Sequence, residues 1–355
     1  MSLKNYRDKI DAIDAKIIEF LNDRAKLSQA IGREKLKEKK AIYSPGREKE
    51  VLRRIKELNK GPLSYEALQA IYQEIMSSSI ALEKPLSIAH LGQQGAFTSS
   101  AARKKFGTQI NYVPCATIGE VFQKVEHNEC DYGVVPVENS VEGVVTHTVD
   151  LLVDYDLKIS AQIMHKISHC LMAKAIVKDL KSIKNIYSNP QVFGQCRNWL
   201  AKHMPKAGEI LVDSTTEAAQ RAAKIKGSAA IASSEAAEIN NLKILKSNIQ
   251  DIAHNTTRFL VIGKQDEEPT GQDRTSILFS IKDQVGALDA MLKPFVENGI
   301  NLTRIESRPS KKKAWEYYFF LDISGHRKDP QVVKALNQLE GICNSLKILG
   351  SYPTE

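Results

Sequence analysis

Residues 253–262 read Ala-His-Asn-Thr-Thr-Arg-Phe-Leu-Val-Ile. The four polar or charged side chains of residues 255–258 run directly into an apolar segment of β type, with no turn residue between them. We expect a strand that begins at Phe259 and holds Thr257 and Arg258 at its end, where ligand sites of α/β folds lie. On local grounds the alternative is a loop whose hydroxyls cap a neighbouring helix, because Ser, Thr and Asn cluster in turns.

The length and composition of the chain narrow the class of protein. Its 355 residues are too many for one ordinary hydrophobic core and predict two or three domains. Hydrophobic residues make up 42% and charged residues 26%, as in globular proteins. No run approaches the roughly 18 apolar residues of a membrane helix, and the first residues carry charges where a signal peptide is apolar. We therefore expect a cytoplasmic protein with no membrane partner.

Cysteine usage, histidine spacing and charge argue against a disulfide framework, a metal site and nucleic-acid binding. The five cysteines are widely spaced and form no Cys-x-x-Cys pair, which predicts reduced thiols. His165 and His169 share one face of an expected strand but lie about 13 Å apart at 3.3 Å per residue, so we expect no metal there. The net charge is +8, but acidic residues interleave with the basic ones and no aromatic platform accompanies them. We expect no nucleic-acid partner; small polyanionic substrates or solvated helix faces explain the excess.

The first 85 residues have the pattern of three helices. Apolar residues recur at helical spacing from Leu3 to about Lys40 without a proline. Such a helix would be about 57 Å long at 1.5 Å per residue, which is too long for so short a bundle to cover. Ser44-Pro45 and Ser64 supply the starts of two further helices, the last of which ends before Pro85. The long helix buries its apolar stripe most simply against a second copy, so we predict a homodimer or a dimer of dimers.

The spacing of the polar side chains in this helical segment predicts which of them share a helix face. Arg24 and Lys35 are eleven residues apart, about 20° from eclipsed on a helix, so they share a face. Arg7 lies roughly 100° off that face and would serve another site, such as the partner's. Taken singly, each is ordinary surface charge, but together they resemble the all-helical chorismate mutase domain over residues 1–85. The residues that carry this resemblance and would bind the substrate are Arg7, Arg24, Lys35, Ser44, Arg47, Glu48, Ser79 and Glu83.

The resemblance implies rearrangement of chorismate to prephenate, with Arg24, Lys35 and Glu83 as catalytic residues. This pericyclic reaction needs no nucleophile or cofactor, only cations that fold the substrate and stabilise charge growing on its ether oxygen. Two positions depart from the family pattern: Ser44 stands where some relatives have Asp, and Glu83 where some have Gln. Since a carboxyl donates a hydrogen bond to the ether oxygen only when protonated, we expect mutase activity to fall as pH rises through the titration of Glu83.

From residue 86 to about 268 the pattern changes to alternating strands and helices with short links. This order predicts an α/β domain over 86–265 with mostly parallel sheets, including one long strand over 158–170. The long crossing segments suggest two lobes with a cleft, as in periplasmic-type binding folds. Ligands of such sheets bind at the carboxyl ends of the strands.

Polar clusters follow several of these expected strands. They are 92–100, 135–143, 188–191 and 213–216. Each cluster alone is explained by helix capping, but together with 253–262 they all occupy cleft-type positions. They resemble prephenate dehydratase, although 90–93 departs from the usual Gly-Pro. The domain order resembles the bifunctional chorismate mutase–prephenate dehydratase family. The substrate-binding residues implied by the resemblance are Thr98, Asn139, Ser140, Ser188, Gln191, Thr215, Thr256, Arg258 and Phe259.

This second resemblance implies that prephenate loses carbon dioxide and its ring hydroxyl to give phenylpyruvate, without a cofactor. Hydroxide is a poor leaving group, so a donor is needed, and the resemblance puts Thr257 in that place. Thr257 would act by a positioned hydrogen bond or by relaying a proton from Glu138. Arg258 or nearby backbone amides would hold a carboxylate. Two alternatives stay open: an arogenate dehydratase and a non-catalytic small-molecule sensor.

Residues 274–355 follow a polar linker and show the order strand-helix-strand-strand-helix-strand. This order predicts a ferredoxin-like α+β fold, with its third strand over Trp315–Ile323. The segments 286–288 and 306–309 resemble the ACT regulatory domain, which implies feedback inhibition by phenylalanine and pairing of ACT domains across a dimer. The first segment would offer backbone amides to a carboxylate, and the second would close over the ligand side chain. The implied phenylalanine-binding residues are Gly286, Ala287, Leu288, Asn301, Leu302, Glu306, Ser307, Arg308 and Pro309.

Overall fold

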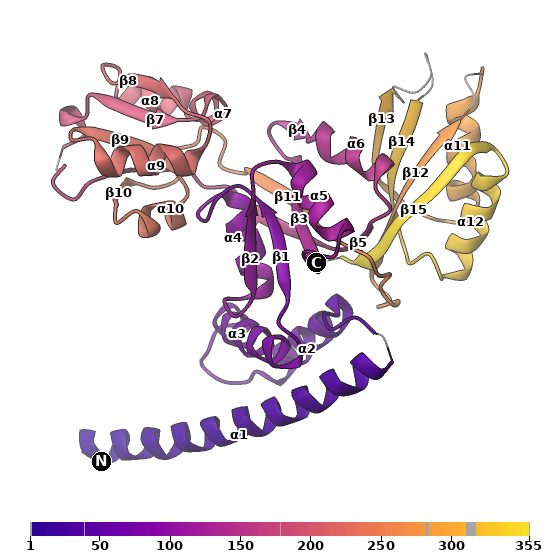
Figure 1. Ribbon diagram of the computed structural model, residues 1–355, viewed down its shortest axis with the longest axis horizontal. Helices are drawn as coiled ribbons and strands as arrows, with labels where there is room; N and C mark the ends of the chain where they lie inside the picture. Colours follow the sequence, from indigo (N-terminus) through magenta and orange to yellow (C-terminus); the bar gives the residue numbers. More distant parts are fainter. Residues whose placement is uncertain (1, 39, 178, 282–283, 310–316, 355) are drawn as a thin grey trace. The chain divides into compact units, whose positions relative to one another are not determined.

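The structure is a computed structural model that describes residues 2–38, 40–177, 179–281, 284–309 and 317–354. Trp315, the expected start of one strand, lies outside these residues. The chain forms two compact units (Figure 1). The first consists of Met1–Ser87 with Lys105–Asn111, and the second of Ile88–Lys104 with Tyr112–Glu355.

The first unit is built on α1 (Leu3–Lys37), α2 (Pro45–Leu58) and α3 (Tyr65–Glu83). Its helices begin where the sequence predicts: the Ser44 hydroxyl accepts a hydrogen bond from an amide of α2, and the Ser64 hydroxyl does so for α3. Neither α1 nor any other described helix is long and apolar enough to cross a membrane. One apolar stripe of α1 is between 48% and 68% exposed, and it consists of Leu3, Tyr6, Ile10, Ile13, Ile17, Phe20, Leu27 and Ile31.

The segment 105–111 belongs to this first unit although it lies far along the sequence. The buried Phe106 ring packs on Tyr43 with 4.8 Å between ring centroids. The Gln109 amide donates to Ser77 Oγ at 3.1 Å. Gly107 has φ +77°, and a Cβ there would lie 2.5 Å from Ser77 Cβ. Only glycine therefore fits at this close approach of the loop to α3.

The first lobe of the second unit is a mixed sheet with the strand order β2–β1–β3–β11–β5, and β4 pairs with β3. β11 is antiparallel to both neighbours and begins at Thr256, so the expectations of a start at Phe259 and of a mostly parallel sheet were wrong. The elements of this lobe are β1 (Ser87–Leu91), α4 (Phe97–Phe106), β2 (Asn111–Cys115), α5 (Ile118–Glu126), β3 (Tyr132–Asn139), β4 (Gly143–Val144), α6 (Thr146–Asp154), β5 (Lys158–Lys166) and β11 (Thr256–Gly263).

The second lobe is another mixed sheet, with the strand order β10–β6–β9–β7–β8. The single strand expected over 158–170 is wrong, because β5 and β6 lie in different sheets and the chain crosses between the lobes at 167–169. The elements of this lobe are β6 (Cys170–Ala173), η1 (Leu180–Ser182), β7 (Asn185–Ser188), α7 (Pro190–Gln195), α8 (Arg197–His203), β8 (Gly208–Leu211), α9 (Thr215–Lys224), β9 (Ser228–Ala232), α10 (Ser234–Ile239) and β10 (Lys243–Lys246).

The C-terminal part of the second unit is an antiparallel sheet with the strand order β13–β14–β12–β15. Its elements are β12 (Asp273–Ile281), α11 (Ala287–Glu297), β13 (Leu302–Pro309), β14 (Tyr317–Ser324), α12 (Pro330–Glu340) and β15 (Cys343–Pro353), in the predicted order. The two helices cover one face of this sheet (Figure 1). On the other face Phe320 and Tyr352 share a core with Val135 and Leu260 of the first lobe.

Candidate active sites

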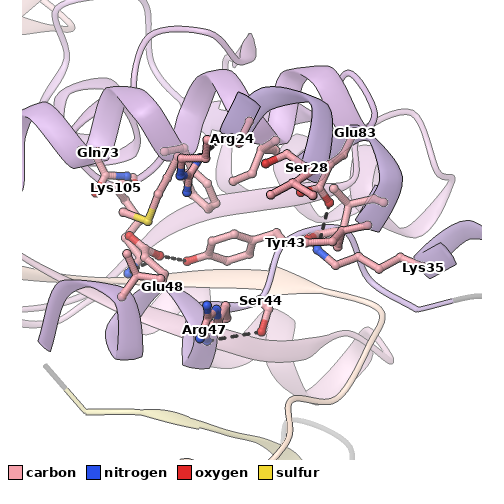
Figure 2. A pocket seen from close by; sticks show the side chains of 18 residues that line it. Arg24, Ser28, Lys35, Tyr43, Ser44, Arg47, Glu48, Gln73, Glu83 and Lys105 are labelled. Atoms are coloured by element: carbon pink, nitrogen blue, oxygen red, sulfur yellow. Dashed lines mark hydrogen bonds and ion pairs between the residues drawn. The ribbon is translucent and has the colours of Figure 1, made fainter. Parts of the chain in front are cut away.

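The first unit contains a cavity of about 460 Å³ lined by residues of α1, α2, α3 and the end of α4 (Figure 2). Its lining combines apolar side chains with charges from separate helices. The charged lining residues are Arg24, Lys35, Arg47, Glu48, Glu83 and Lys105. Seven of the eight residues expected to bind the first substrate therefore line one cavity. The eighth, Arg7, is exposed in the first turns of α1 and does not line it.

One end of the cavity is defined by an ion pair between α1 and α3. Lys35 Nζ lies 2.9 Å from Glu83 Oε2 and donates to the Ile42 carbonyl at 2.7 Å. A turn earlier on α3, Ser79 accepts a hydrogen bond from Arg24 Nη1. These contacts bring together on one wall an ammonium, a guanidinium and a carboxyl group, as the helical spacing predicts.

The opposite wall is formed by α2 and the residues before it. Tyr43 donates its hydroxyl to Glu48 Oε2 at 3.0 Å, and Glu48 is only 8% exposed (Figure 2). Lys105 Nζ lies 3.1 Å from the same carboxylate oxygen. Ser44 caps α2 through the Arg47 amide, which places both residues at the rim. This wall therefore holds a carboxylate that already has two polar partners.

In the second unit, the stretch 253–262 places a hydroxyl within a directional hydrogen-bond chain. Asn139 Oδ1 accepts the backbone amides of Val141 and Glu142 at 2.9 Å each, which orients its side-chain amide. Its Nδ2 then donates to Thr257 Oγ1 at 2.8 Å and to Asn255 Oδ1 at 2.7 Å. Because Thr257 accepts here, its own hydroxyl proton can be donated to a bound molecule.

The same chain continues into the second lobe. Asn255 Nδ2 donates to Gln195 Oε1 at 3.0 Å, and Gln195 Nε2 donates to Glu142 Oε1 at 3.0 Å. Since Gln195 Oε1 is an acceptor, the His169 Nε2 that lies 2.7 Å away carries the proton. Burial lowers the pKa of His169, against the opposing effect of this hydrogen bond. The sequence reasoning missed Gln195 and His169, which link the two lobes beside Thr257.

Arg258 points to the opposite face of the sheet from Thr257, because successive residues of a strand alternate. Its Nη1 lies 2.5 Å from Asp322 Oδ2 and its Nη2 donates to the Tyr352 hydroxyl at 2.8 Å. The side chains of Arg258 and Asp322 are 7% and 0% exposed. The expectation that Arg258 holds a substrate carboxylate does not fit this geometry, since its guanidinium is occupied by a buried ion pair with the C-terminal domain.

Glu138 is also turned away from the proposed donor. It is the register partner of Arg258, whereas its neighbour Asn139 pairs with Thr257. Glu138 Oε2 lies 3.5 Å from Nε of Arg304 on β13. The expected proton relay from Glu138 to Thr257 therefore does not fit, because the two side chains lie on opposite faces of the sheet.

Some of the other residues predicted to line the cleft hydrogen-bond to backbone groups, and the rest lie on helices or strands of this domain. Ser140 donates to the His254 carbonyl and accepts from the Thr256 amide, both at 3.0 Å, and so ties the end of β3 to β11. Ser188 donates to the Ile231 carbonyl at 2.8 Å inside the second sheet. Thr98 is buried on α4, Gln191 is exposed on α7, Thr215 is buried in the first turn of α9, and the buried Phe259 ring lies 6.3 Å from the His165 ring.

In the C-terminal domain the expected ligand segments lie at the start of α11 and on the edge strand β13. Gly286 caps α11 with φ +81°, and Ala287 and Leu288 form its first turn. Asn301 and Leu302 lie at the start of β13. On that strand Glu306, Ser307 and Pro309 alternate between half-buried and exposed, and Arg308 Nε pairs with Asp150 Oδ1 of α6 at 3.3 Å. Arg308 is thus held against the first lobe.

Three family models match the chain in the order of these domains. Chorismate mutase type II matches residues 6–84, prephenate dehydratase 88–267 and the ACT domain 275–341. A relative from Aquifex aeolicus (strain VF5), named bifunctional chorismate mutase/prephenate dehydratase, is 46% identical over 99% of this chain and 98% of its own length. The chain belongs to this bifunctional family. It therefore combines a chorismate mutase and a prephenate dehydratase with an ACT domain.

Solved structures resemble about three quarters of this chain. The prephenate dehydratase of Arthrobacter aurescens, solved in complex with L-Phe, has a TM-score of 0.71 and 32% identity, and covers 76% of this chain and 90% of that one. GqqA, described as a novel type of quorum quenching acylase, has a TM-score of 0.70 and 28% identity, with coverages of 76% and 98%. A second relative of the bifunctional family, from Pseudomonas aeruginosa, is 43% identical over 99% of this chain and 97% of its own length.

Metal ligands are not grouped anywhere in the described residues, where no three His, Cys, Asp or Glu side chains gather as a metal site would require. The mutase cavity and the dehydratase hydrogen-bond chain are built from amides, hydroxyls, cations and carboxylates. These groups position substrates and stabilise charge, which suits both reactions of the family.

Proposed function

We propose that chorismate binds in the cavity of the first unit and that prephenate binds in front of the Thr257 hydroxyl. The observation that carries the proposal is the direction of the hydrogen-bond chain from Asn139, which leaves the Thr257 proton for a ligand. In the mutase cavity, helices α1 to α3 supply cations to a substrate with two carboxylates.

In the mutase reaction we assign Lys35, and Glu83 in its protonated form, to the ether oxygen, where negative charge grows in the transition state. Arg24, supported by Ser79, and Arg47 on the opposite rim bind the carboxylates. Because bonds form and break in one concerted step, these residues act by holding the compact conformer and by stabilising charge.

In the dehydratase reaction the ring carboxylate leaves as carbon dioxide. The electron pair of the broken carbon–carbon bond makes the ring aromatic. The ring hydroxyl leaves with the electron pair of its carbon–oxygen bond and takes up one proton, supplied by solvent, to become water. Thr257 hydrogen-bonds the departing oxygen, and Asn139 fixes the direction of that bond. The roles of Thr98, Gln191, Thr215 and Thr256 as substrate contacts stay predictions.

The test of both activities is one assay on the full-length protein. Chorismate is added, and chorismate, prephenate and phenylpyruvate are followed over time, with prephenate and arogenate supplied separately as substrates. We expect prephenate to appear and then give phenylpyruvate. If no phenylpyruvate forms from prephenate, the second site binds small molecules without catalysis. If arogenate is turned over faster than prephenate, arogenate is the substrate of the second site.

We further propose that phenylalanine binds the ACT domain and lowers dehydratase activity. The Arthrobacter aurescens relative, solved with L-Phe, supports this. Gly286 caps α11 without a side-chain hydrogen bond, and the start of a helix favours a carboxylate. Calorimetry should detect phenylalanine binding, and scrambling 306–308 should abolish it. Unchanged binding after the scramble would refute the assignment of this segment.

The exposed stripe of α1 supports the proposal of a homodimer in which two copies of this helix pack together. Arg7 lies on α1 away from its own cavity, so we place it in the cavity of the second copy. Ile13→Glu and Ile17→Glu, combined, should give a monomer by light scattering and lose mutase activity while dehydratase activity persists. A dimer of unchanged stability would contradict this packing.

A further inference from the structure

Lys105 lies within the residues matched by the prephenate dehydratase family, yet its side chain lines the chorismate mutase cavity. It is in the last turn of α4, and its Nζ lies 3.1 Å from Glu48 Oε2 (Figure 2). The side chains of Lys105 and Glu48 are 19% and 8% exposed. This pair is therefore largely shielded from solvent, where an ion pair acts more strongly than at the surface.

Helix α3 anchors the segment that carries Lys105. Gln73 Nε2 donates to the Lys105 carbonyl. Glu74 Oε2 accepts from the Thr108 hydroxyl at 2.6 Å and from the Thr108 amide at 3.2 Å. Together with the Gln109–Ser77 bond described above, these contacts fix residues 105–109 against α3. The Lys105 ammonium group is therefore positioned by contacts within the first unit.

The charge of Glu48 gives Lys105 its function. A carboxylate in a cavity that receives a dianion repels the substrate unless a cation compensates it. The lining has four cations and two carboxylates when Lys105 is included, so its surplus of two positive charges matches the two carboxylates of chorismate. Without Lys105 the surplus falls to one, and Glu48 Oε2 keeps the hydrogen bond from the neutral Tyr43 hydroxyl.

We propose that Lys105 is a positioning residue of the chorismate mutase site: it neutralises and orients Glu48 so that the cavity accepts a dianionic substrate. This inference rests on the proposed binding of chorismate in this cavity. A residue of the dehydratase sequence thus takes part in substrate binding by the mutase.

The first test uses the full-length protein with Lys105→Met, which keeps the length of the side chain and removes its charge. We expect kcat/KM for chorismate to fall by about 10-fold to 100-fold, mainly through KM, because the uncompensated Glu48 carboxylate repels the dianionic substrate. Lys105→Arg should restore it. Turnover of added prephenate should stay unchanged in both, and Lys104→Met is the matched control for mutase activity.

The second test separates charge compensation from packing. In the Glu48→Gln background, adding Lys105→Met should change kcat/KM by less than about twofold, because the carboxylate to be compensated is gone. Because the comparison is a ratio of two kcat/KM values in the same background, it can be measured even if Glu48→Gln itself is slow. An equal loss in both backgrounds, or a wild-type KM in Lys105→Met alone, would overturn the proposal. Arg24→Met distinguishes failure of this proposal from failure of the proposed chorismate site. If Arg24→Met retains full mutase activity, chorismate does not react in this cavity.

Discussion

The Arg258 guanidinium lies 2.5 Å from the Asp322 carboxylate, and the residue before Arg258 is Thr257. The ion pair joins β11 of the dehydratase domain to β14 of the ACT domain, and the Tyr352 hydroxyl of β15 completes it. A shift of the ACT sheet would therefore reach the backbone of the proposed proton donor within one residue. This contact therefore joins the ACT domain to the strand that carries the proposed proton donor.

Asp322→Asn should destabilise the protein strongly, because it leaves the buried Arg258 charge without its counter-ion. Removing one partner of a buried pair costs about 3–5 kcal/mol. Urea unfolding should show this loss, together with lower dehydratase turnover and unchanged mutase turnover. The control is Glu268→Gln, which removes an exposed pair with Lys328 and should cost less than about 1 kcal/mol. Equal effects of the two substitutions would refute the role of the buried pair.

Thr257→Val should remove the donor to the leaving hydroxyl while preserving the shape of the side chain. We expect dehydratase turnover to fall at least about 100-fold, in line with the loss of a positioned proton donor. Chorismate consumption by the same sample provides the internal control for folding. If phenylpyruvate still forms at nearly the wild-type rate, Thr257 is not the donor.

Lys35→Met should abolish most mutase activity, because it removes the cation beside the proposed position of the ether oxygen. Loss of one such electrostatic contact costs about 100-fold or more in turnover. The matched control is Lys37→Met, two residues along the same helix, where the ammonium pairs with Glu34 at the exposed surface. Mutase activity that survives in Lys35→Met would move the reaction away from the Lys35–Glu83 pair.

Stability should fall as pH rises from about 4.5 to about 8 because of Glu267. Burial is the main cause that raises the pKa of Glu267 to about 8, with a smaller effect of Asp266 and Glu268. In this window the folded state keeps a proton that the unfolded state has already lost, so ionisation disfavours folding. Glu267→Gln should therefore gain a few kcal/mol relative to wild type at pH 9 but little at pH 4 in urea unfolding. The same difference at both pH values would exclude this cause.

Elements defined by local signals could be predicted from the sequence. The starts of α2 and α3 follow from Ser44-Pro45 and Ser64, whose hydroxyls cap the helices as expected. The gathering of Arg24, Lys35 and Glu83 follows from helical periodicity and from the family resemblance. The order of the C-terminal strands and helices likewise follows from alternation and short links.

Contacts set by distant parts of the chain could not be predicted in this way. The partner of Arg258 is Asp322, which lies 64 residues further on, so nothing near Arg258 indicates a buried ion pair. Glu138 lies near the end of β3 and Thr257 near the start of β11, but only the register of the two strands shows that their side chains face opposite sides of the sheet. The division of 158–170 between two sheets has no proline or glycine to mark it. In each case tertiary packing decides what local pattern leaves open.

Helix α4 begins in the dehydratase lobe and ends with Lys105 and Phe106 in the mutase unit. Cutting the gene near residue 86, where the two family matches meet, would therefore not yield two complete enzymes. The mutase fragment would lose part of its cavity wall, and the dehydratase fragment would expose the Phe106 ring that packs on Tyr43. The boundary between the two family matches is therefore not a boundary at which the folded chain can be divided.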